Sequence, residues 1–435
     1  MERMELHMKK QTDLETMLQN GSLDSRLSEI CAGSPQQLPA RRERLLALIG
    51  TFASIYGEGR EIGLYSAPGR TEMGGNHTDH QHGRVLAAAI DLDMAACASK
   101  NESRMIRVTS DGYPEIRVDL SVLEPVKKES GTTAALIRGI ASKLSELGYP
   151  VSGFDACVTS QVLGGSGLSS SAAFEVLMGV VMNDLFCGGK LNPVQIAQIG
   201  QYSENVFFGK PCGLMDQLAS SVGGITAIDF KNPENPTVEK LECSPSDYGY
   251  ALCIIDSGAD HSDLTDEYAS IPGEMGQVAA FFGKKVLRQV SFEEFWNSIP
   301  ALRKQTGDRA VLRAIHFYSD NDLVPEQQKL LESGNFDGFL ALVNQSGHSS
   351  AECLQNIFCC SAPKAQAVSL TIAAARRILQ GRGAVRVHGG GFAGTVQAYV
   401  PLDQQEEFRG KMEAILGQGR CHFLNIRPGG GTVIA

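Results

Sequence analysis

Hydrophobic residues in the first half of the chain recur with two spacings, one typical of helices and one typical of strands. The helical spacing predicts helices over residues 133–147, 169–186 and 193–208. Short β-prone runs predict strands over residues 62–67, 85–90, 94–98, 105–109, 154–162 and 225–230. The first of these strands is expected to end at Pro68-Gly69, because this pair marks a turn.

The order of the elements predicts an α+β protein rather than a doubly wound sheet. Residues 1–56 show helical spacing and no candidate chemistry, so they are interpreted as a helical lead-in. Residues 231–248 are rich in proline, asparagine and charge, and we expect them to separate two lobes. The second half then predicts strands over 250–256, 384–387, 395–400 and 421–426 and a helix over 404–416.

Composition narrows the classes of partner. A net charge of −10 argues against nucleic acid, and no apolar run approaches the ~20 residues of a membrane helix, so neither nucleic acid nor a membrane is expected as a partner. The 11 cysteines include no C-x-x-C pair, which indicates free thiols. The first ten residues lack the apolar core of a signal peptide, and a cytoplasmic location is predicted.

A run of glycines and serines precedes the predicted helix 169–186. It reads Val162-Leu163-Gly164-Gly165-Ser166-Gly167-Leu168-Ser169-Ser170-Ser171-Ala172-Ala173. Glycines allow close approach of a ligand, and a helix N-terminus offers unpaired N–H groups, so the run suits a phosphate. The chain has no G-x-x-x-x-G-K-[ST] motif, and no G-x-G-x-x-G follows a strand. The sequence therefore predicts a phosphate cradle without the usual lysine, with a tight strand-to-helix corner as the alternative.

Three further segments combine polar side chains with glycine. Residues 67–80 place Arg, Asn, His and Asp after a strand, where they could pair with sugar hydroxyls or form a solvated turn. Residues 204–217 carry Glu204, which on local grounds is usually a surface charge, and Asp216, which in this position is more often a helix cap than a base. Gly389-Gly390-Gly391 lies between two predicted strands and equally suits a simple turn.

Taken in order, these segments resemble the galactokinases, a branch of the GHMP small-molecule kinases. The similar segments are Pro68-Gly69-Arg70 with His77-Thr78-Asp79, Gly167-Leu168-Ser169-Ser170-Ser171-Ala172, Cys212-Gly213-Leu214-Met215-Asp216-Gln217 and Gly389-Gly390-Gly391-Phe392. The resemblance runs from about residue 60 to the C-terminus. It implies a two-lobed GHMP kinase fold with the active site between the lobes. The N-terminal lobe (57–240) would be ribosomal-S5-like and the C-terminal lobe (241–435) ferredoxin-like.

The resemblance also implies a reaction, in which the γ-phosphoryl group of ATP is transferred to the anomeric hydroxyl of galactose. Asp216 would orient that hydroxyl or accept its proton, with Arg70 beside it and the phosphate. The expected ATP-binding residues are Gly164, Gly165, Ser166, Gly167, Leu168, Ser169, Ser170, Ser171 and Ala172. Mg²⁺ would be held by Ser171 and Glu204. The expected sugar-binding residues are Asn76, His77, Asp79 and Tyr268.

One residue departs from the family pattern. Family members usually carry Glu at the position of Asn76, which the resemblance places at the sugar C6 hydroxyl. An amide donates hydrogen bonds as well as accepting them, whereas an ionised carboxylate only accepts. This departure raises galacturonate as an alternative substrate, and N-acetylgalactosamine as a third.

Two other functions are compatible with the fold: a galactose sensor without turnover, and a kinase of mevalonate or homoserine. The retention of Arg70, Asp216 and Ser171-Ala172 favours an enzyme over a sensor. The His77-Thr78-Asp79 segment favours a sugar, because the other substrates offer no ring of hydroxyls. The enzyme is expected to be a monomer.

Overall fold

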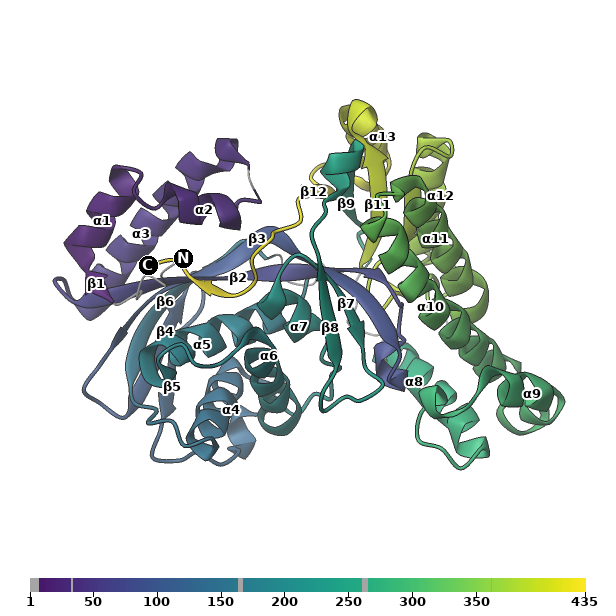
Figure 1. Ribbon diagram of the computed structural model, residues 1–435, viewed down its shortest axis with the longest axis horizontal. Helices are drawn as coiled ribbons and strands as arrows, with labels where there is room; N and C mark the ends of the chain where they lie inside the picture. Colours follow the sequence, from purple (N-terminus) through teal and green to yellow (C-terminus); the bar gives the residue numbers. More distant parts are fainter. Residues whose placement is uncertain (1–7, 33, 163–166, 260–264, 361) are drawn as a thin grey trace.

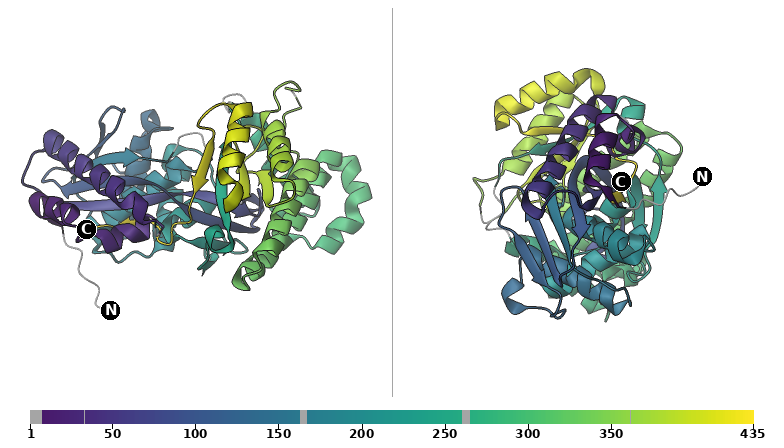
Figure 2. Two further views of the ribbon diagram at one scale, coloured as in Figure 1. Left: turned by 90° about the horizontal axis from the view of Figure 1, so that it is seen from above. Right: turned by 90° about the vertical axis from the view of Figure 1, so that its left-hand side faces the viewer.

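The computed structural model describes residues 8–32, 34–162, 167–259, 265–360 and 362–435. Figure 1 shows two lobes, one built on a large sheet and one on a smaller sheet with long helices beside it. This is the two-lobed α+β architecture expected of a GHMP kinase. The C-terminal residues return to the first lobe, where Ala435 accepts a hydrogen bond from the Leu64 backbone (Figure 2).

Two long strands, β2 (Glu61–Gly74) and β3 (Arg84–Lys100), form the centre of the large sheet. The strand order is β1-β2-β3-β6-β4-β5, with β13 paired to β2, β7 paired to β3 and β8 paired to β7. The remaining strands are β1 (Lys9–Lys10), β4 (Met105–Ser110), β5 (Ile116–Asp119), β6 (Phe154–Ser160), β7 (Ile225–Asp229), β8 (Thr237–Leu241) and β13 (Thr432–Val433). The pairs are antiparallel except β4 with β6. β8 lies inside the segment interpreted as a linker.

Helices cover both faces of this sheet (Figure 1). On one face lie α4 (Thr133–Glu146), α5 (Ser170–Cys187), α6 (Pro193–Tyr202) and α7 (Met215–Val222), with a π-helical turn, η4 (Ser203–Phe208), after α6. On the other face lie α1 (Gln11–Gln19), α2 (Asp24–Ile30) and α3 (Leu38–Tyr56). Their apolar residues, Leu14 and Phe52 among them, pack against strand residues such as Leu64. The lead-in is therefore one layer of the first lobe.

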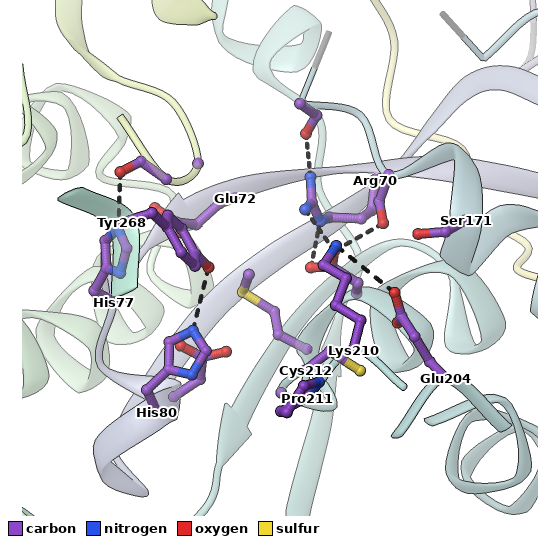
Figure 3. Close-up of a pocket in the computed structure, with 18 of the residues that line it drawn as sticks. Arg70, Glu72, His77, His80, Ser171, Glu204, Lys210, Pro211, Cys212 and Tyr268 are labelled. Atoms are coloured by element: carbon purple, nitrogen blue, oxygen red, sulfur yellow. Dashed lines mark hydrogen bonds and ion pairs between the residues drawn. The ribbon is translucent and has the colours of Figure 1, made fainter. Parts of the chain in front are cut away.

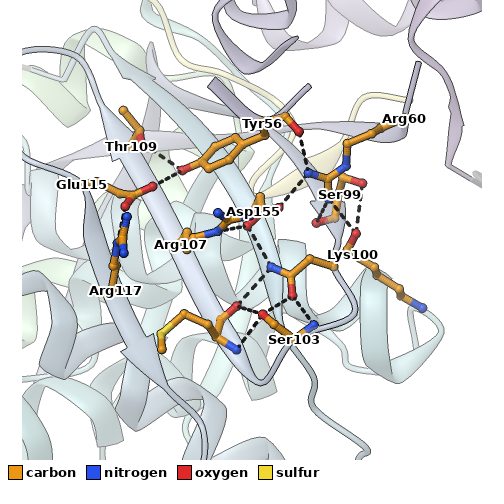
Figure 4. Close-up of polar contacts among 12 residues, drawn as sticks. Tyr56, Arg60, Ser99, Lys100, Ser103, Arg107, Thr109, Glu115, Arg117 and Asp155 are labelled. Carbon is orange, nitrogen blue, oxygen red and sulfur yellow. Dashed lines mark hydrogen bonds and ion pairs between the residues drawn. The ribbon is translucent and has the colours of Figure 1, made fainter. Parts of the chain in front are cut away.

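Polar contacts fix α3 to the strands beneath it. The hydroxyl of Tyr56, at the end of α3, lies 2.9 Å from Thr109 Oγ1 and donates to Glu115 (Figure 4). The buried carboxylate of Asp155 accepts hydrogen bonds from Arg60 and Arg107. The end of the helical layer is therefore joined to β4 and β6 by these polar contacts as well as by apolar packing.

The smaller sheet has the order β10-β11-β9-β12 and is antiparallel. Its strands are β9 (Tyr250–Asp256), β10 (Ala384–Val387), β11 (Thr395–Pro401) and β12 (Cys421–Leu424). The surrounding helices are α8 (Thr265–Phe281), α9 (Phe292–Thr306), α10 (Asp308–Glu332), α11 (Phe336–Ser349), α12 (Ala367–Leu379) and α13 (Gln405–Leu416). Leu252 and Ile254 of β9 face the core shared with the first lobe, whereas Cys253 and Ile255 face α12 and α13.

Two strand predictions were wrong. β2 does not end at Pro68-Gly69 but continues to Gly74, because a register shift between Pro68 and Arg70 absorbs the turn pair as a β-bulge. The two runs 85–90 and 94–98 are one strand, β3, whose middle carries the buried carboxylates Asp91 and Asp93. Both acids have hydrogen-bond partners, which is why the strand tolerates them.

The helix α5 is long and mostly apolar. Among the described residues it is the one helix long and apolar enough, by length and composition, to cross a membrane. However, 78% of its 18-residue stretch is buried inside the protein, between the large sheet and the neighbouring helices. Its composition is that of a central core helix.

Candidate active site

A cavity of about 480 Å³ lies where the two lobes meet (Figure 3). Its wall is formed by the end of β2, the N-termini of α5 and α7, residues 210–213, the loop 389–392 and Tyr268 of α8. In Figure 3, Arg70 lies near the middle of the wall. We call one half the Tyr268 side (Glu72, His77, Asp79, His80 and Tyr268) and the other the Ser171 side (Ser170, Ser171, Glu204 and Lys210).

Arg70 and Asp216 form a bidentate ion pair at the boundary between these halves. Nε and Nη2 of Arg70 each donate to one carboxylate oxygen of Asp216, both at 2.7 Å. Arg70 also donates to the carbonyl of Gly167, so its guanidinium is fixed from two sides. Burial opposes ionisation of Asp216, but Arg70 and Ser169 outweigh it and lower the pKa of this carboxyl. Asp216 is therefore an anion aimed at the cavity.

The glycine-serine run approaches the same pair. Ser169, just before α5, has a left-handed backbone (φ 57°) and donates its hydroxyl to Asp216 Oδ2 at 2.7 Å. Such a conformation is costly for a non-glycine residue and is typical of functional sites. Gly167, Ser169, Ser170 and Ser171 line the cavity, whereas Leu168 and Ala172 are buried in the core. The predicted residues Gly164, Gly165 and Ser166 lie outside the described residues.

The Ser171 side combines a helix N-terminus with a carboxylate and an ammonium group. Glu204 accepts a hydrogen bond from Gln217 Nε2 at 3.0 Å, which orients its carboxylate. The Lys210 amine lies 3.8 Å from Glu204 and is mostly exposed. The glycine-serine run itself holds no lysine, but Lys210 brings a cation to the same half from a separate segment. An ammonium and free backbone N–H groups are suited to an anion.

The Tyr268 side presents polar groups packed against glycine backbone. The His77 ring donates through Nε2 to the carbonyl of Gly390, and no hydrogen bond among the described residues reaches its Nδ1. Burial lowers the pKa of His77 to about 3, so the ring is neutral. The ring of Tyr268 lies 5.2 Å from that of His77. A Cβ at Gly390 would lie 2.6 Å from the Tyr268 ring, so a side chain there would displace this ring.

Asp79 faces the cavity close to the backbone of the Asp216 segment. A Cβ at Gly213 would lie 2.3 Å from Asp79 Oδ2, so a side chain there would displace the Asp79 carboxylate. His80 lines the same side, and its Nε2 lies 3.3 Å from the Tyr268 hydroxyl. Three of the four predicted sugar-binding residues, His77, Asp79 and Tyr268, therefore lie on one side of the cavity.

The fourth predicted sugar-binding residue, Asn76, does not line the cavity. It is completely buried, and its amide nitrogen donates to Glu72 and to the carbonyl of Gly389. Its amide oxygen accepts from Asn356 and Ser350. Because every hydrogen-bonding position of the amide is used, Asn76 has none left for a sugar substituent. Asn76 therefore gives no reason to expect a sugar with a C6 carboxylate.

Glu72 lines the cavity, although the sequence analysis did not single it out. Strand alternation places it on the same face of β2 as Arg70, because the register between them is regular. The signal was present in the sequence, but ending the strand at Pro68 concealed it. Burial raises the pKa of Glu72 to about 7, against the lowering effect of Arg386 and Arg70.

Comparisons with known proteins identify two matching family models. The GHMP kinase N-terminal domain matches residues 135–224, which include the glycine-serine run and Asp216. The galactokinase galactose-binding signature matches residues 50–100, which include Arg70 and the polar segment after it. Among solved structures, the *Lactococcus lactis* galactokinase in complex with galactose superimposes with a TM-score of 0.77. It is 25% identical and covers 89% of this chain and 99% of its own.

Other relatives differ in how similar they are to this chain in sequence and in structure. The mevalonate kinase of Methanococcus jannaschii shares the fold with a TM-score of 0.60 at 15% identity, covering 83% of this chain and 98% of its own. The galactokinase of Streptomyces coelicolor is 30% identical over 79% of this chain and 86% of the relative. The galactokinase of Actinobacillus pleuropneumoniae serotype 5b is 31% identical over 86% of this chain and 92% of the relative. With this identity over nearly the whole relative, the chain belongs to the galactokinase family of the GHMP kinases.

Proposed function

We propose that this protein transfers the γ-phosphoryl group of ATP to the anomeric hydroxyl of galactose. The observation that carries the proposal is the Arg70–Asp216 pair, which lies between a hydroxyl-pairing wall and a helix N-terminus within one cavity. The family relationship supports the same reaction. A galactose sensor would need no such charged pair at the junction, so we favour catalysis.

Asp216 is proposed to orient the attacking hydroxyl. Its lowered pKa makes it a weak base that stays ionised, so positioning contributes more than proton abstraction before transfer. Phosphoryl transfer does not need a strong base, since most of the barrier is overcome by alignment and charge stabilisation. Arg70 supplies that charge, because its guanidinium holds both Asp216 and the carbonyl of Gly167 next to the phosphate seat.

The phosphates of ATP are proposed to bind on the Ser171 side, against the backbone of the residues that begin α5. Lys210 adds positive charge at the rim. The hydroxyl of Ser171 and the carboxylate of Glu204 both line this half and are oxygen donors, which suits Mg²⁺. Magnesium prefers few protein ligands together with phosphate oxygens, and when bound it would neutralise charge on the transferred phosphate.

Galactose is proposed to bind on the Tyr268 side. The Nδ1 atom of neutral His77 is a buried acceptor without a partner among the described residues, so a sugar hydroxyl can donate to it. Asp79 offers carboxylate oxygens on the same side. A site that pairs hydroxyls in this way rejects analogues that leave its polar groups unpaired.

The experiment that tests this proposal measures ADP release with ATP and a panel of acceptors. The panel contains galactose, glucose, galacturonate, N-acetylgalactosamine and mevalonate, with a control lacking any acceptor. Galactose is expected to give the highest kcat/KM, by at least 100-fold over galacturonate. Release of ADP that does not depend on galactose, or a preference for mevalonate, would overturn the proposal.

A further inference from the structure

Glu72 lies in the cavity, but it has no role in the proposed reaction as described above. Its side chain is 3% exposed, yet it lines the Tyr268 side of the cavity. One oxygen, Oε1, accepts from the Asn76 amide at 3.0 Å and from the guanidinium of Arg386. The hydrogen bonds found to the Glu72 carboxylate among the described residues both reach Oε1, and none of them reaches the other oxygen, Oε2.

We infer that Glu72 is a specificity-determining residue of the sugar site, whose Oε2 accepts a hydrogen bond from one ring or exocyclic hydroxyl of galactose. This inference rests on the proposed function, because it assigns galactose to the Tyr268 side. It replaces the earlier interpretation in which Asn76 meets the sugar. Asn76 lies behind Glu72 instead and holds its carboxylate in place.

The partners of Glu72 favour its charged form, against the burial that raises its pKa to about 7. Arg386 is buried and forms an ion pair with Glu72, and it donates through Nε to the carbonyl of Val387. The backbone carbonyl of Glu72 accepts from Gln397 at 2.8 Å, which fixes the strand at this residue. A carboxylate fixed at one oxygen and open at the other is a strong acceptor for a hydroxyl, since hydrogen bonds to charged groups exceed neutral ones.

The same arrangement determines which sugars the site excludes. Glu72 and Asp79 place two carboxyl groups on the Tyr268 side, so a sugar acid would bring a third. Like charges at short range in a buried site cost more than they would in water. The cavity therefore selects a neutral sugar, and galacturonate is disfavoured rather than favoured.

The test compares wild type with Glu72→Gln at pH 8, where the carboxyl is mostly ionised given its pKa of about 7. Substrates are galactose and its 2-, 3-, 4- and 6-deoxy analogues, assayed by ADP release. Loss of an acceptor for a charged hydrogen bond is expected to lower kcat/KM for galactose about 10- to 100-fold, chiefly through KM. For one deoxy analogue, the one lacking the paired hydroxyl, kcat/KM is expected to be unchanged by the substitution.

A matched control is Asp320→Asn. This substitution removes a buried carboxylate that contacts Asn76, the residue that also holds Glu72. Asp320 accepts the backbone N–H of Asn76 at 2.7 Å but does not line the cavity. Thermal unfolding of both variants reports any loss of stability. The control is expected to change all five sugars equally, so the ratio between galactose and each analogue stays at the wild-type value.

Competition with galacturonate provides an independent readout, since an inhibitor need not be turned over. Its inhibition constant against galactose is expected to fall at least 5-fold in Glu72→Gln relative to wild type, because one repelling charge is gone. Equal losses across all five sugars in Glu72→Gln, or an unchanged inhibition constant, would overturn the inference. Failure of wild type to phosphorylate galactose would instead overturn the proposed function.

Discussion

Two aspartates with arginine partners lie close to the same pair of strands, one enclosed in the core and one partly open to the cavity. Asp93, in β3, is 1% exposed and is surrounded by Arg41, Arg44 and Arg427. Asp216, beside β2, has one arginine partner, and 30% of its side chain is exposed to the cavity. Both carboxyls have a lowered pKa, in each case because arginines outweigh burial.

The two carboxylates differ in how much of their surface is left open to a ligand. The three arginines and the hydroxyl of Ser66 surround Asp93, and they join the helical layer, the sheet and the C-terminal segment. Asp216 keeps an exposed edge that a substrate can reach. We therefore propose a structural role for the enclosed Asp93 and a functional role for Asp216, although the pKa of both carboxyls is shifted in the same direction.

Of the substitutions that separate the two aspartates, Asp216→Asn should cause the largest loss of kcat. An amide at this position loses the charge that orients the hydroxyl and pairs Arg70, so kcat is expected to fall about 10³- to 10⁵-fold. Stability should change little, because the pair is partly solvated. Steady-state kinetics and thermal unfolding measure both. Activity within 10-fold of wild type would contradict the role given to Asp216.

Asp93→Asn should show the opposite balance. Removing this charge leaves three arginines facing one another in the core, which is expected to lower the free energy of unfolding by about 3–5 kcal/mol. Urea denaturation measures this loss. The kcat of the folded fraction should stay within about 3-fold of wild type, and a large fall in kcat without a loss of stability would reverse the assignment.

Arg70→Lys sharpens the comparison from the side of the cation. Lysine keeps the charge but cannot make the bidentate contact, so kcat is expected to fall about 100-fold. The matched control is Arg41→Lys, where two other arginines still hold Asp93. That variant should keep wild-type kcat. Equal kinetic losses in both variants would indicate a general effect on folding.

Acid stability provides a smaller and independent effect. Burial lowers the pKa values of His77 and His388 to about 3, whereas the unfolded chain titrates near 6.5. Below pH 6.5 the unfolded state therefore binds protons that the folded state does not, and stability falls as the pH drops toward 3. At pH 5 each histidine should cost about 2 kcal/mol relative to pH 7.

His388→Gln tests this contribution by urea denaturation at pH 7 and pH 5. His388 bridges Thr71 of β2 and Thr395 of β11, so glutamine keeps polar contacts without titrating. The difference in unfolding free energy between the two pH values should shrink by about 2 kcal/mol in the variant. An unchanged difference would mean that His388 is protonated in the folded protein.

The sequence allowed the main features of the cavity to be predicted because they depend on local rules. The glycine-serine run followed by an apolar stretch specifies a loop and a helix N-terminus wherever it folds. The convergence of Arg70 with Asp216, which are 146 positions apart, depends on tertiary structure. It was predicted only from the family resemblance, and the structure brings the two side chains together.

Other features could not be predicted from local patterns. The helix α10 carries buried Arg313, His316 and Asp320, so its apolar stripe is interrupted and periodicity did not reveal it. His316 Nε2 donates to the carbonyl of Asn76, so Nδ1 of the neutral ring accepts from the Ser349 hydroxyl, and these contacts give His316 a structural role. The burial of Asn76 depends on partners more than 200 positions away, which no local pattern contains.

Transfer of the phosphoryl group to the anomeric oxygen of galactose, at C1, can be measured directly. Incubating wild-type enzyme with ATP and [1-¹³C]galactose, and recording the ³¹P and ¹³C spectra of the product, locates the new bond. We expect a phosphorus–carbon coupling at C1 that builds up with time and is absent in Asp216→Asn. A phosphate on any other carbon, or the same C1 product at the same rate from the variant, would contradict the central claim.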